Sequence, residues 1–260
     1  MRIRLLTYNL FFNQAFSQLK MILKKYQPEI VCLQEVITNN KDYLTEIEKL
    51  DYQLADYTNC FFEYGKIWGI ATLYKKKSLQ FNDSKTIPLV NSFYEIVRQI
   101  ANFFQQKEIK RTVLKTTFQL INSSKKITIY NIHLSAISFN NLRIKQLQKI
   151  MFNEIDKKGV IILCGDFNFP IQRKKLETIM KQYQLKEATN KIYYTINYFN
   201  TLKKSPFNFI IRFFLKIVAK IKSRAKLDYI FYRNLKHIKT QRLDYSFSDH
   251  YPLLAEFEIF

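Results

Sequence analysis

Hydrophobic residues recur along the chain in short runs whose length and composition are typical of β-strands. The runs are rich in Ile, Leu, Val, Tyr and Phe, and polar residues bound them. Eight ranges carry this pattern: 3–10, 29–35, 67–74, 111–121, 126–134, 159–165, 227–233 and 251–259. The runs at 111–121 and 126–134 are separated only by "NSSK", which predicts a β-hairpin.

Helical periodicity occupies part of the sequence between these runs. Apolar residues recur every three or four positions in Gln14–Tyr26, which Pro28 ends, and again in Asn141–Ile155. Strands alternating with helices indicate α/β content, and the hairpin argues against an all-parallel sheet. We therefore predict a four-layer α/β sandwich, in which two packed, mixed β-sheets are flanked by helices.

Two apolar stretches look like insertions into this frame, around residues 88–105 and 203–225. The first contains Leu89–Phe104, with apolar residues at helical spacing. In the second, Phe207–Arg224, every fourth residue is basic, which places one basic stripe on an otherwise apolar helix. The stripe consists of Arg212, Lys216, Lys220 and Arg224. With few Gly or Pro and no internal repeat, residues 1–260 are expected to form a single domain.

Polar residues of a particular kind stand at the ends of six predicted strands. One Asp or Asn at a strand end is an ordinary turn residue, because its side chain bonds nearby backbone groups. Six strand ends that carry an amide, a carboxylate or an imidazole instead predict a site. These residues are Asn9, Glu35, His133, Asp166, Asn168, Asp228, Asp249 and His250.

The residue types in this set suit phosphate ester chemistry. Asp, Glu and Asn oxygens, in a chain without a CxxC pair or an HExxH motif, favour a hard cation such as Mg²⁺, or alternatively Mn²⁺. Imidazoles bind anionic oxygens or move a proton near neutral pH. Hydrolysis of a phosphate ester needs both, because charge must be neutralised and a water molecule must be aligned.

Six motifs occur in the order in which they are found in one known superfamily. They are "TYNL", "LQEV", "NIHLSA", "GDFNFP", "LDYIF" and "SDHYPL", between residues 7 and 253. The chain resembles the endonuclease/exonuclease/phosphatase superfamily, which includes deoxyribonuclease I and the neutral sphingomyelinases. The combination of "GDFN" with "SDHYP" is specific, and the resemblance implies a deoxyribonuclease I-like fold.

The resemblance also implies roles for the residues at the strand ends. Glu35 would be the main metal ligand with Asn9 beside it, and Asp249 would support this metal or a second one. Asp166 would orient or deprotonate the attacking water, and Asn168 would hold a phosphate oxygen.

Further roles follow from the same resemblance. His250 would contact the scissile phosphate and would be oriented by Asp228. His133 matches the deoxyribonuclease I and sphingomyelinase branches. Arg111, which opens a strand, is a candidate phosphate contact, although a basic residue at that place is often simply solvated.

Charge and composition then narrow the choice of partner. The chain has 42 basic and 21 acidic residues, a net charge of +21, which an anionic partner would offset. A lysine-rich composition bias is the alternative explanation. Three cysteines without CxxC spacing, no signal-peptide pattern and no apolar tract of bilayer length predict a cytoplasmic protein, expected to be a monomer.

Two substrate classes remain open. If the substrate is nucleic acid, the basic stripe follows a phosphate backbone, and the chain is a Mg²⁺-dependent nuclease acting on DNA or RNA. If it is a phospholipid, Phe213 and Phe214 enter the headgroup layer of an anionic membrane, as in a sphingomyelinase-type enzyme. Alternatively, both inserted helices simply pack on the domain. Charge and "SDHYPL" favour the nuclease, whereas the complete set of catalytic types argues against an inactive binding module.

Overall fold

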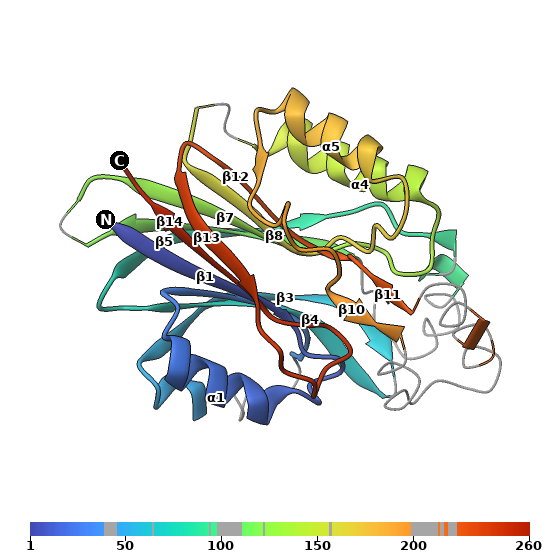
Figure 1. Cartoon of the computed structure of the whole chain (residues 1–260), viewed down its shortest axis with the longest axis horizontal. Helices are drawn as coiled ribbons and strands as arrows, with labels where there is room; N and C mark the ends of the chain where they lie inside the picture. Colours follow the sequence, from blue (N-terminus) through green and yellow to red (C-terminus); the bar gives the residue numbers. More distant parts are fainter. Residues whose placement is uncertain are drawn as a thin grey trace.

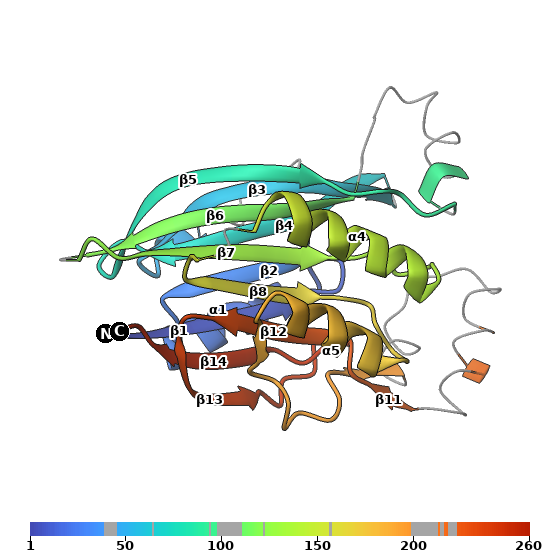
Figure 2. The same cartoon turned by 90° about the horizontal axis from the view of Figure 1, so that it is seen from above.

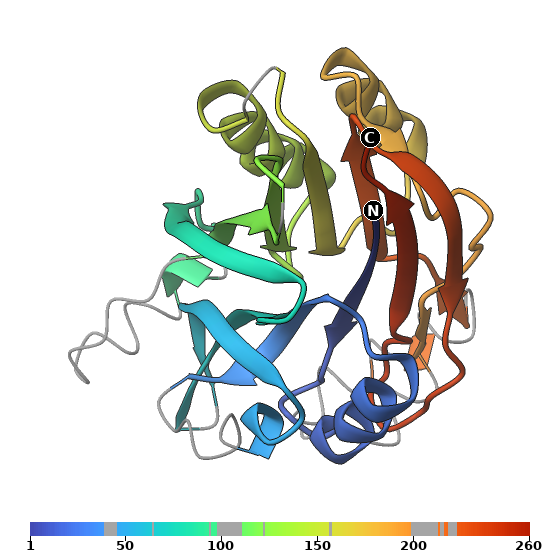
Figure 3. The ribbon, with the colours of Figure 1, turned by 90° about the vertical axis from the view of Figure 1, so that its left-hand side faces the viewer.

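The computed structural model contains two six-stranded sheets that pack against each other between helices (Figure 1). It describes residues 1–38, 46–63, 65–93, 95–97, 111–121, 123–155, 158–198, 213, 216–217 and 223–260. Viewed along the sandwich, α1 lies outside one sheet, and α4 and α5 lie outside the other (Figure 3). The predicted fold class, two mixed sheets flanked by helices, is therefore confirmed.

The first sheet has the strand order β13-β14-β1-β2-β4-β3. Its strands are β1 (Arg2–Asn9), β2 (Ile30–Ile37), β3 (Tyr52–Glu63), β4 (Lys66–Lys75), β13 (Lys236–Arg242) and β14 (Leu253–Glu258). The neighbours β1 and β2 are parallel, whereas the other pairs are antiparallel. Parallel pairing brings the carboxyl ends of β1 and β2 to the same edge, so Asn9 lies beside Gln34 in register.

The second sheet has the order β5-β6-β7-β8-β12-β9. Its strands are β5 (Leu79–Pro88), β6 (Thr112–Leu120), β7 (Lys126–His133), β8 (Ile161–Asp166), β12 (Asp228–Arg233) and β9 (Lys186–Glu187). The predicted hairpin is formed by β6 and β7, and β7 is parallel to β8. The short strands β10 (Ile196–Asn197) and β11 (Arg224–Ala225) form a separate, antiparallel two-stranded sheet.

The eight apolar runs correspond to the interior strands of the two sheets. Interior strands are covered on both faces, which demands nearly continuous apolar sequence. Within the two six-stranded sheets, the strands that this pattern missed are β3, β5, β9 and β13, and all four lie at sheet edges. Edge strands carry many polar residues, as the exposed positions of β5 and β13 show.

Three apolar layers hold the sandwich together. Between the sheets, Leu5 of β1, Ile129 of β7 and Ile162 of β8 belong to one buried cluster. On the outer face of the first sheet packs α1 (Phe16–Tyr26), a helix that ends at the left-handed Gln27 just before Pro28. The helices α4 (Asn140–Asn153) and α5 (Arg173–Gln182) cover the second sheet (Figure 2).

A buried polar contact joins the two sheets near the carboxyl ends of β2 and β7. The amide nitrogen of Gln34 in β2 donates to Asn131 Oδ1 in β7 at 2.8 Å. The Asn131 amide in turn donates to the backbone oxygens of Leu33 and Ala71 in the first sheet. Buried polar groups are costly unless paired, so these bonds fix the position of one sheet relative to the other.

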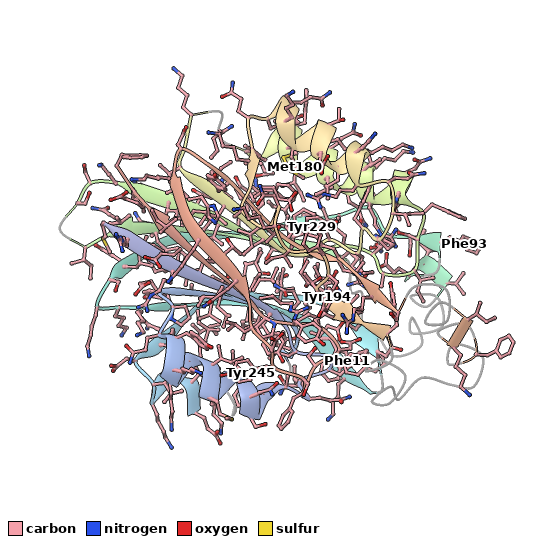
Figure 4. The ribbon with its side chains drawn as sticks, viewed as in Figure 1. Phe11, Phe93, Met180, Tyr194, Tyr229 and Tyr245 are labelled. Carbon is pink, nitrogen blue, oxygen red and sulfur yellow. The ribbon has the colours of Figure 1, made fainter. Side chains whose placement is uncertain are left out.

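The two predicted insertions are described only in part, at residues 88–93, 95–97, 213, 216–217 and 223–225. Figure 4 shows Phe93 of the first insertion at the edge of the molecule, whereas Tyr229 lies in the interior and Met180 lies between α5 and its sheet. None of the helices in the described ranges is long and apolar enough to cross a membrane.

Candidate active site

The centre of the site is Asp166, the last residue of β8. Its backbone is in register with His133 of β7 on one side and with Asp228 of β12 on the other. The preceding residue, Gly165, makes this arrangement possible. Its φ is +131°, and a Cβ there would lie 2.0 Å from the carbonyl oxygen of Ile132. Only glycine therefore lets β8 approach β7 so closely before Asp166.

Glu35 reaches the site from the first sheet through a local irregularity of β2. The register of β2 with β4 shifts between Gln34 and Val36, and Glu35 adopts a left-handed φ of +56°. A bulge of this kind redirects one side chain without ending the strand. The Glu35 carboxylate accepts hydrogen bonds from the Phe12 backbone N–H and from the Asn9 amide, each at 3.1 Å.

Asn9, at the end of β1, connects the carboxylates of the two sheets. Its Nδ2 donates both to Glu35 Oε1 and to Asp166 Oδ2 at 3.1 Å. Its Oδ1 accepts from the backbone N–H of Phe11 at 3.0 Å. In this arrangement Asn9 fixes the distance between the two carboxylates, and its role as a metal ligand stays a prediction.

His250 and Asp228 form a buried pair on the opposite side of Asp166. The two side chains are joined by a hydrogen bond of 2.8 Å between Nδ1 of His250 and Oδ2 of Asp228. The other ring nitrogen, Nε2, lies 3.7 Å from Asp166 Oδ2. His250 therefore presents Nε2 to Asp166 while its Nδ1 is held by Asp228, and the catalytic roles of this pair stay a prediction.

His133 lies against the same carboxylates from the end of β7. Its Nε2 is 3.7 Å from Asp166 Oδ2 and 3.8 Å from Glu35 Oε1. Its Nδ1 is buried and has no hydrogen-bond partner in the described parts of the chain. Burial, with the positive charge of Arg111 next, lowers the pKa of His133 well below its usual value, so this ring is neutral.

Two carboxylates of the site, Glu35 and Asp166, have raised pKa values and are protonated more easily than in water. Burial, together with the charge of Asp249, raises the pKa of Glu35 to about 7. Burial also raises the pKa of Asp166 to about 7, although the charge of His250 opposes it. For His250, burial disfavours the charged ring, but Asp228 and Asp166 outweigh it and raise its pKa well above the usual value.

Asn168 and Asp249 also reach this end of the sandwich. The backbone N–H of Asn168 donates to Asp166 Oδ1 at 2.8 Å, and its amide donates to the Leu134 oxygen at 3.1 Å. Asp249 Oδ1 lies 4.0 Å from His250 Nε2. Both side chains are buried beside the predicted catalytic groups.

Arg111 immediately precedes β6 and is buried rather than solvated. Its guanidinium pairs with Glu95 of the first insertion, with 2.5 Å between Nε and Oε1. Of the predicted surface residues, Phe213 and Lys216 are exposed, and Arg224 lies over the ring of Tyr194 at 4.5 Å. Arg212, Phe214 and Lys220 lie outside the described residues.

Three polar residues that the sequence analysis did not select support the site. Thr195 accepts, through Oγ1, the backbone N–H groups of Leu227 and Asp228 at 3.0 Å each. Ser248 donates to the Asn9 oxygen at 2.7 Å, which ties the "SDH" segment to β1. The third is Glu95, and its spacing from Ser92 is a capping-box signal that could have indicated a helix start there. Figure 4 shows Phe11 after β1 and Tyr194 before β10 at this end of the sandwich.

The donor set fits a divalent cation. Asp166 and Asp249 are buried carboxylates, and their negative charges help to raise the pKa of the partly buried Glu35, a charge conflict that a bound cation would relieve. Their oxygens are the ligands that Mg²⁺ prefers. Asp166, Asp228 and His250 also offer ligand atoms within 4.8 Å of one another. Within this second group, His250 Nδ1 and Asp228 Oδ2 are joined by a hydrogen bond.

Comparisons with known proteins bear on the family and the fold of the chain. The family model described as "Endonuclease/Exonuclease/phosphatase family" matches residues 6–250. No curated protein sequence matches the chain. Among solved structures, the human Nocturnin catalytic domain with bound sulfate superposes with a TM-score of 0.68 at 20% identity, covering 100% of this chain and 94% of that one.

Two further structures share the fold. ANGEL2, a 2',3'-cyclic phosphatase in complex with adenosine-2',3'-vanadate, has a TM-score of 0.72 at 15% identity, over 99% of this chain and 95% of its own. Humanized D. rerio TDP2 has a TM-score of 0.65 at 17% identity, over 99% of both chains. The site, the fold and the match over residues 6–250 show that the chain belongs to the endonuclease/exonuclease/phosphatase family of phosphoric ester hydrolases.

Proposed function

We propose that the protein is a Mg²⁺-dependent phosphodiesterase whose substrate is a nucleic acid, DNA or RNA. One observation carries the hydrolytic part of this proposal. Asp166 lies between the Asn9–Glu35 pair of the first sheet and the pair that Asp228 of the second sheet forms with His250, which precedes β14. Acidic groups thus surround Asp166 together with an imidazole, which are the groups that hydrolysis of a phosphate ester needs.

The chain's own groups have distinct tasks in the reaction. Glu35 would hold the cation, which when bound would neutralise charge on phosphate oxygens. Asp166, with a pKa of about 7, is suited to take a proton from the attacking water near neutral pH. The water oxygen forms the new bond to phosphorus, and the bond to the leaving ester oxygen breaks.

His250 would stabilise the charge that develops in this step. Its raised pKa keeps the ring protonated, so Nε2 donates to a phosphate oxygen in the transition state. Asp228 holds Nδ1 and thereby the ring plane. Asn168, whose backbone N–H donates to Asp166, is assigned the neighbouring phosphate oxygen.

A nucleic-acid substrate is supported by charge and by a group of Arg and Tyr side chains next to the site. Arg242 stacks on the rings of Tyr194 and Tyr251 at 4.0 and 4.4 Å, and the exposed Arg224 lies over Tyr194. Tyr251 follows His250 directly. Cationic side chains held on aromatic rings are common in channels that follow single strands. The nucleoside ligand of the ANGEL2 structure points to the same class.

A substrate panel tests this proposal. Plasmid DNA, single-stranded DNA, RNA and sphingomyelin-containing liposomes are incubated with the purified protein in Mg²⁺ or in EDTA, with His250→Ala as the control for contamination. We expect Mg²⁺-dependent cleavage of a nucleic acid that weakens as salt rises, because phosphate contacts release counterions. Arg224→Gln should lower the affinity for the polymer and leave turnover of a small phosphodiester unchanged.

A phospholipid substrate is the second candidate, and exposed apolar side chains near the same end of the sandwich favour it. Phe93, Ile137 and Phe139 are 81%, 51% and 88% exposed. Phe93 belongs to the first insertion, and Ile137 and Phe139 belong to the segment that follows β7. Aromatic and branched side chains together are typical of surfaces that enter the headgroup layer.

A matched pair of variants separates the two candidates. Phe139 immediately precedes α4 and is 88% exposed, whereas Phe152 lies near the end of the same helix and is 82% exposed. The two variants to compare are therefore Phe139→Ser and Phe152→Ser. If the lipid is the substrate, only Phe139→Ser lowers liposome binding and phosphocholine release. If a nucleic acid is the substrate, neither variant releases phosphocholine.

A further inference from the structure

Residues 89–91 are attached to the strand that Arg111 opens. The backbone N–H of Leu89 donates to the Arg111 oxygen at 2.7 Å. The N–H of Arg111 donates to Asn91 Oδ1 at 3.2 Å. These two bonds place the first residues of the insertion beside Arg111, so that the next helical turn begins next to the guanidinium.

Glu95 belongs to that turn and is held there from several sides. It forms a capping box with Ser92, whose N–H donates to Glu95 Oε2 at 2.7 Å and whose Oγ accepts from the Glu95 N–H at 3.2 Å. Ser135 Oγ, in the segment after β7, donates to the same Oε2 at 2.8 Å. Gln146 of α4 donates to Ser135 Oγ and to the Val90 oxygen.

The remaining carboxylate oxygen of Glu95 binds Arg111. Oε1 accepts from Arg111 Nε at 2.5 Å. Both side chains are largely buried, with exposed fractions of 8% for Arg111 and 13% for Glu95. A carboxylate whose other oxygen is already bonded twice cannot rotate freely. It therefore fixes the guanidinium plane of Arg111 rather than merely neutralising its charge.

The guanidinium is also placed against the active site. It lies over the face of Phe61 at 4.7 Å, and the edge of that ring packs against His133 with centroids 5.8 Å apart. Its Nη1 is buried and has no hydrogen-bond partner among the described residues. A buried guanidinium N–H without an acceptor is costly, and phosphate oxygens are acceptors that match its geometry.

We propose that Glu95 is a positioning residue of the hydrolase, which holds the Arg111 guanidinium so that Nη1 donates to a phosphate oxygen of the substrate. This inference rests on the proposed phosphodiesterase function and gives the first insertion a role in it. Arg111 binds the phosphate, whereas Glu95 acts only through Arg111. A purely structural ion pair would satisfy the guanidinium without leaving Nη1 buried and unpaired.

A double-mutant cycle tests the inference. Wild type, Glu95→Gln, Arg111→Met and the double variant are compared for kcat and KM on thymidine 5'-(p-nitrophenyl phosphate) in Mg²⁺. The thermal midpoint of each protein is recorded in parallel. Because each single variant loses or misplaces one charge-assisted hydrogen bond to the phosphate, kcat/KM should fall by about 10- to 100-fold. In the Arg111→Met background, Glu95→Gln should change kcat/KM by less than about twofold, because the group it positions is gone.

Controls distinguish the possible failures. Glu154→Gln removes another Glu ion pair, with Lys85, outside the site, and it should leave kcat/KM unchanged. If Glu95→Gln lowers the thermal midpoint but not kcat/KM, or lowers kcat/KM equally in both backgrounds, the positioning role is wrong. If His250→Ala hydrolyses the substrate as fast as wild type, the proposed function itself fails.

Inorganic phosphate gives an independent readout. Its inhibition constant should rise by a similar factor in both variants, since Arg111→Met removes the donor and Glu95→Gln releases it from its position. An unchanged inhibition constant in Arg111→Met would show that Nη1 does not contact phosphate and would overturn the inference.

Discussion

Replacing Gly165 by alanine tests whether the close approach of β7 and β8 creates the site. An added Cβ would lie 2.0 Å from the Ile132 oxygen, whereas contacts below 3.0 Å are essentially never found, so the strands must separate by about 1 Å. The backbone conformation adds strain, because φ is +131°. Overpacking costs roughly 1–3 kcal/mol and the strained conformation another 1–3 kcal/mol, so the free energy of unfolding should fall by about 2–6 kcal/mol.

The assay is thermal unfolding followed by circular dichroism, with Gly65→Ala as the matched control. At about 2 °C per kcal/mol for a chain of this size, Gly165→Ala should lower the midpoint by about 4–12 °C. Gly65 also has a positive φ, +72°, but a Cβ there meets nothing within 4 Å. Gly65→Ala should therefore lower the midpoint by only about 2–4 °C, from strain of about 1–2 kcal/mol.

Activity provides the second half of this test. Because Asp166 follows Gly165, separating the strands displaces its carboxylate from His133 and Asp228. A displacement of about 1 Å can cost on the order of 100-fold in rate, so kcat should fall well below that of the control at a temperature where both variants are folded. If both variants melt within 2 °C of each other and have equal kcat, the close approach does not position the site.

Three further changes have defined expected outcomes. Asp228→Asn removes the charge that raises the pKa of His250, so the alkaline limit of the kcat–pH profile should move to lower pH and kcat should fall about 10²- to 10⁴-fold. Thr195→Val leaves two buried N–H groups without their acceptor and should lower the free energy of unfolding in urea by about 2–4 kcal/mol, whereas Thr195→Ser retains the hydroxyl. Mg²⁺ at 100 times its dissociation constant should stabilise the wild type by about 2.7 kcal/mol in thermal unfolding, and Glu35→Gln should lose most of this effect.

Each of these outcomes has a clear opposite. An unshifted alkaline limit in Asp228→Asn would show that His250 is not the group that titrates. Equal urea midpoints for the Val and Ser variants at Thr195 would show that its hydroxyl does not support the site. An identical Mg²⁺ response in Glu35→Gln would place the cation elsewhere.

Sequence patterns predicted the interior of the sandwich because interior strands have to be apolar on both faces. The edge strands escaped prediction, since β5 and β13 alternate between polar and partly buried positions without a continuous apolar run. The polar residues at the strand ends indicated a cluster because parallel pairs such as β1–β2 and β7–β8 bring their carboxyl ends to the same edge of a sheet.

The parts of the site that the sequence did not predict depend on contacts between distant segments. The bulge that aims Glu35 arises from the pairing of β2 with β4 and leaves no local signal. Thr195 lies in a stretch without hydrophobic periodicity, and its importance comes from Asp228, 33 residues away in the chain. Glu95 belongs to a stretch whose apolar periodicity gives no sign of a buried charge. Its spacing from Ser92 indicates only a capping box at a helix start.

The most direct test of the central claim compares the imidazoles of two histidines. Turnover of a small phosphodiester is measured for wild type, His250→Gln and His237→Gln in Mg²⁺ and in EDTA. His237 lies in the edge strand β13 and bonds Thr240. Hydrolysis that needs the cation, falls at least about 100-fold in His250→Gln and persists in His237→Gln is the predicted result. Turnover that persists in EDTA, or in His250→Gln at the wild-type rate, would contradict a metal-dependent hydrolase centred on Asp166 and His250.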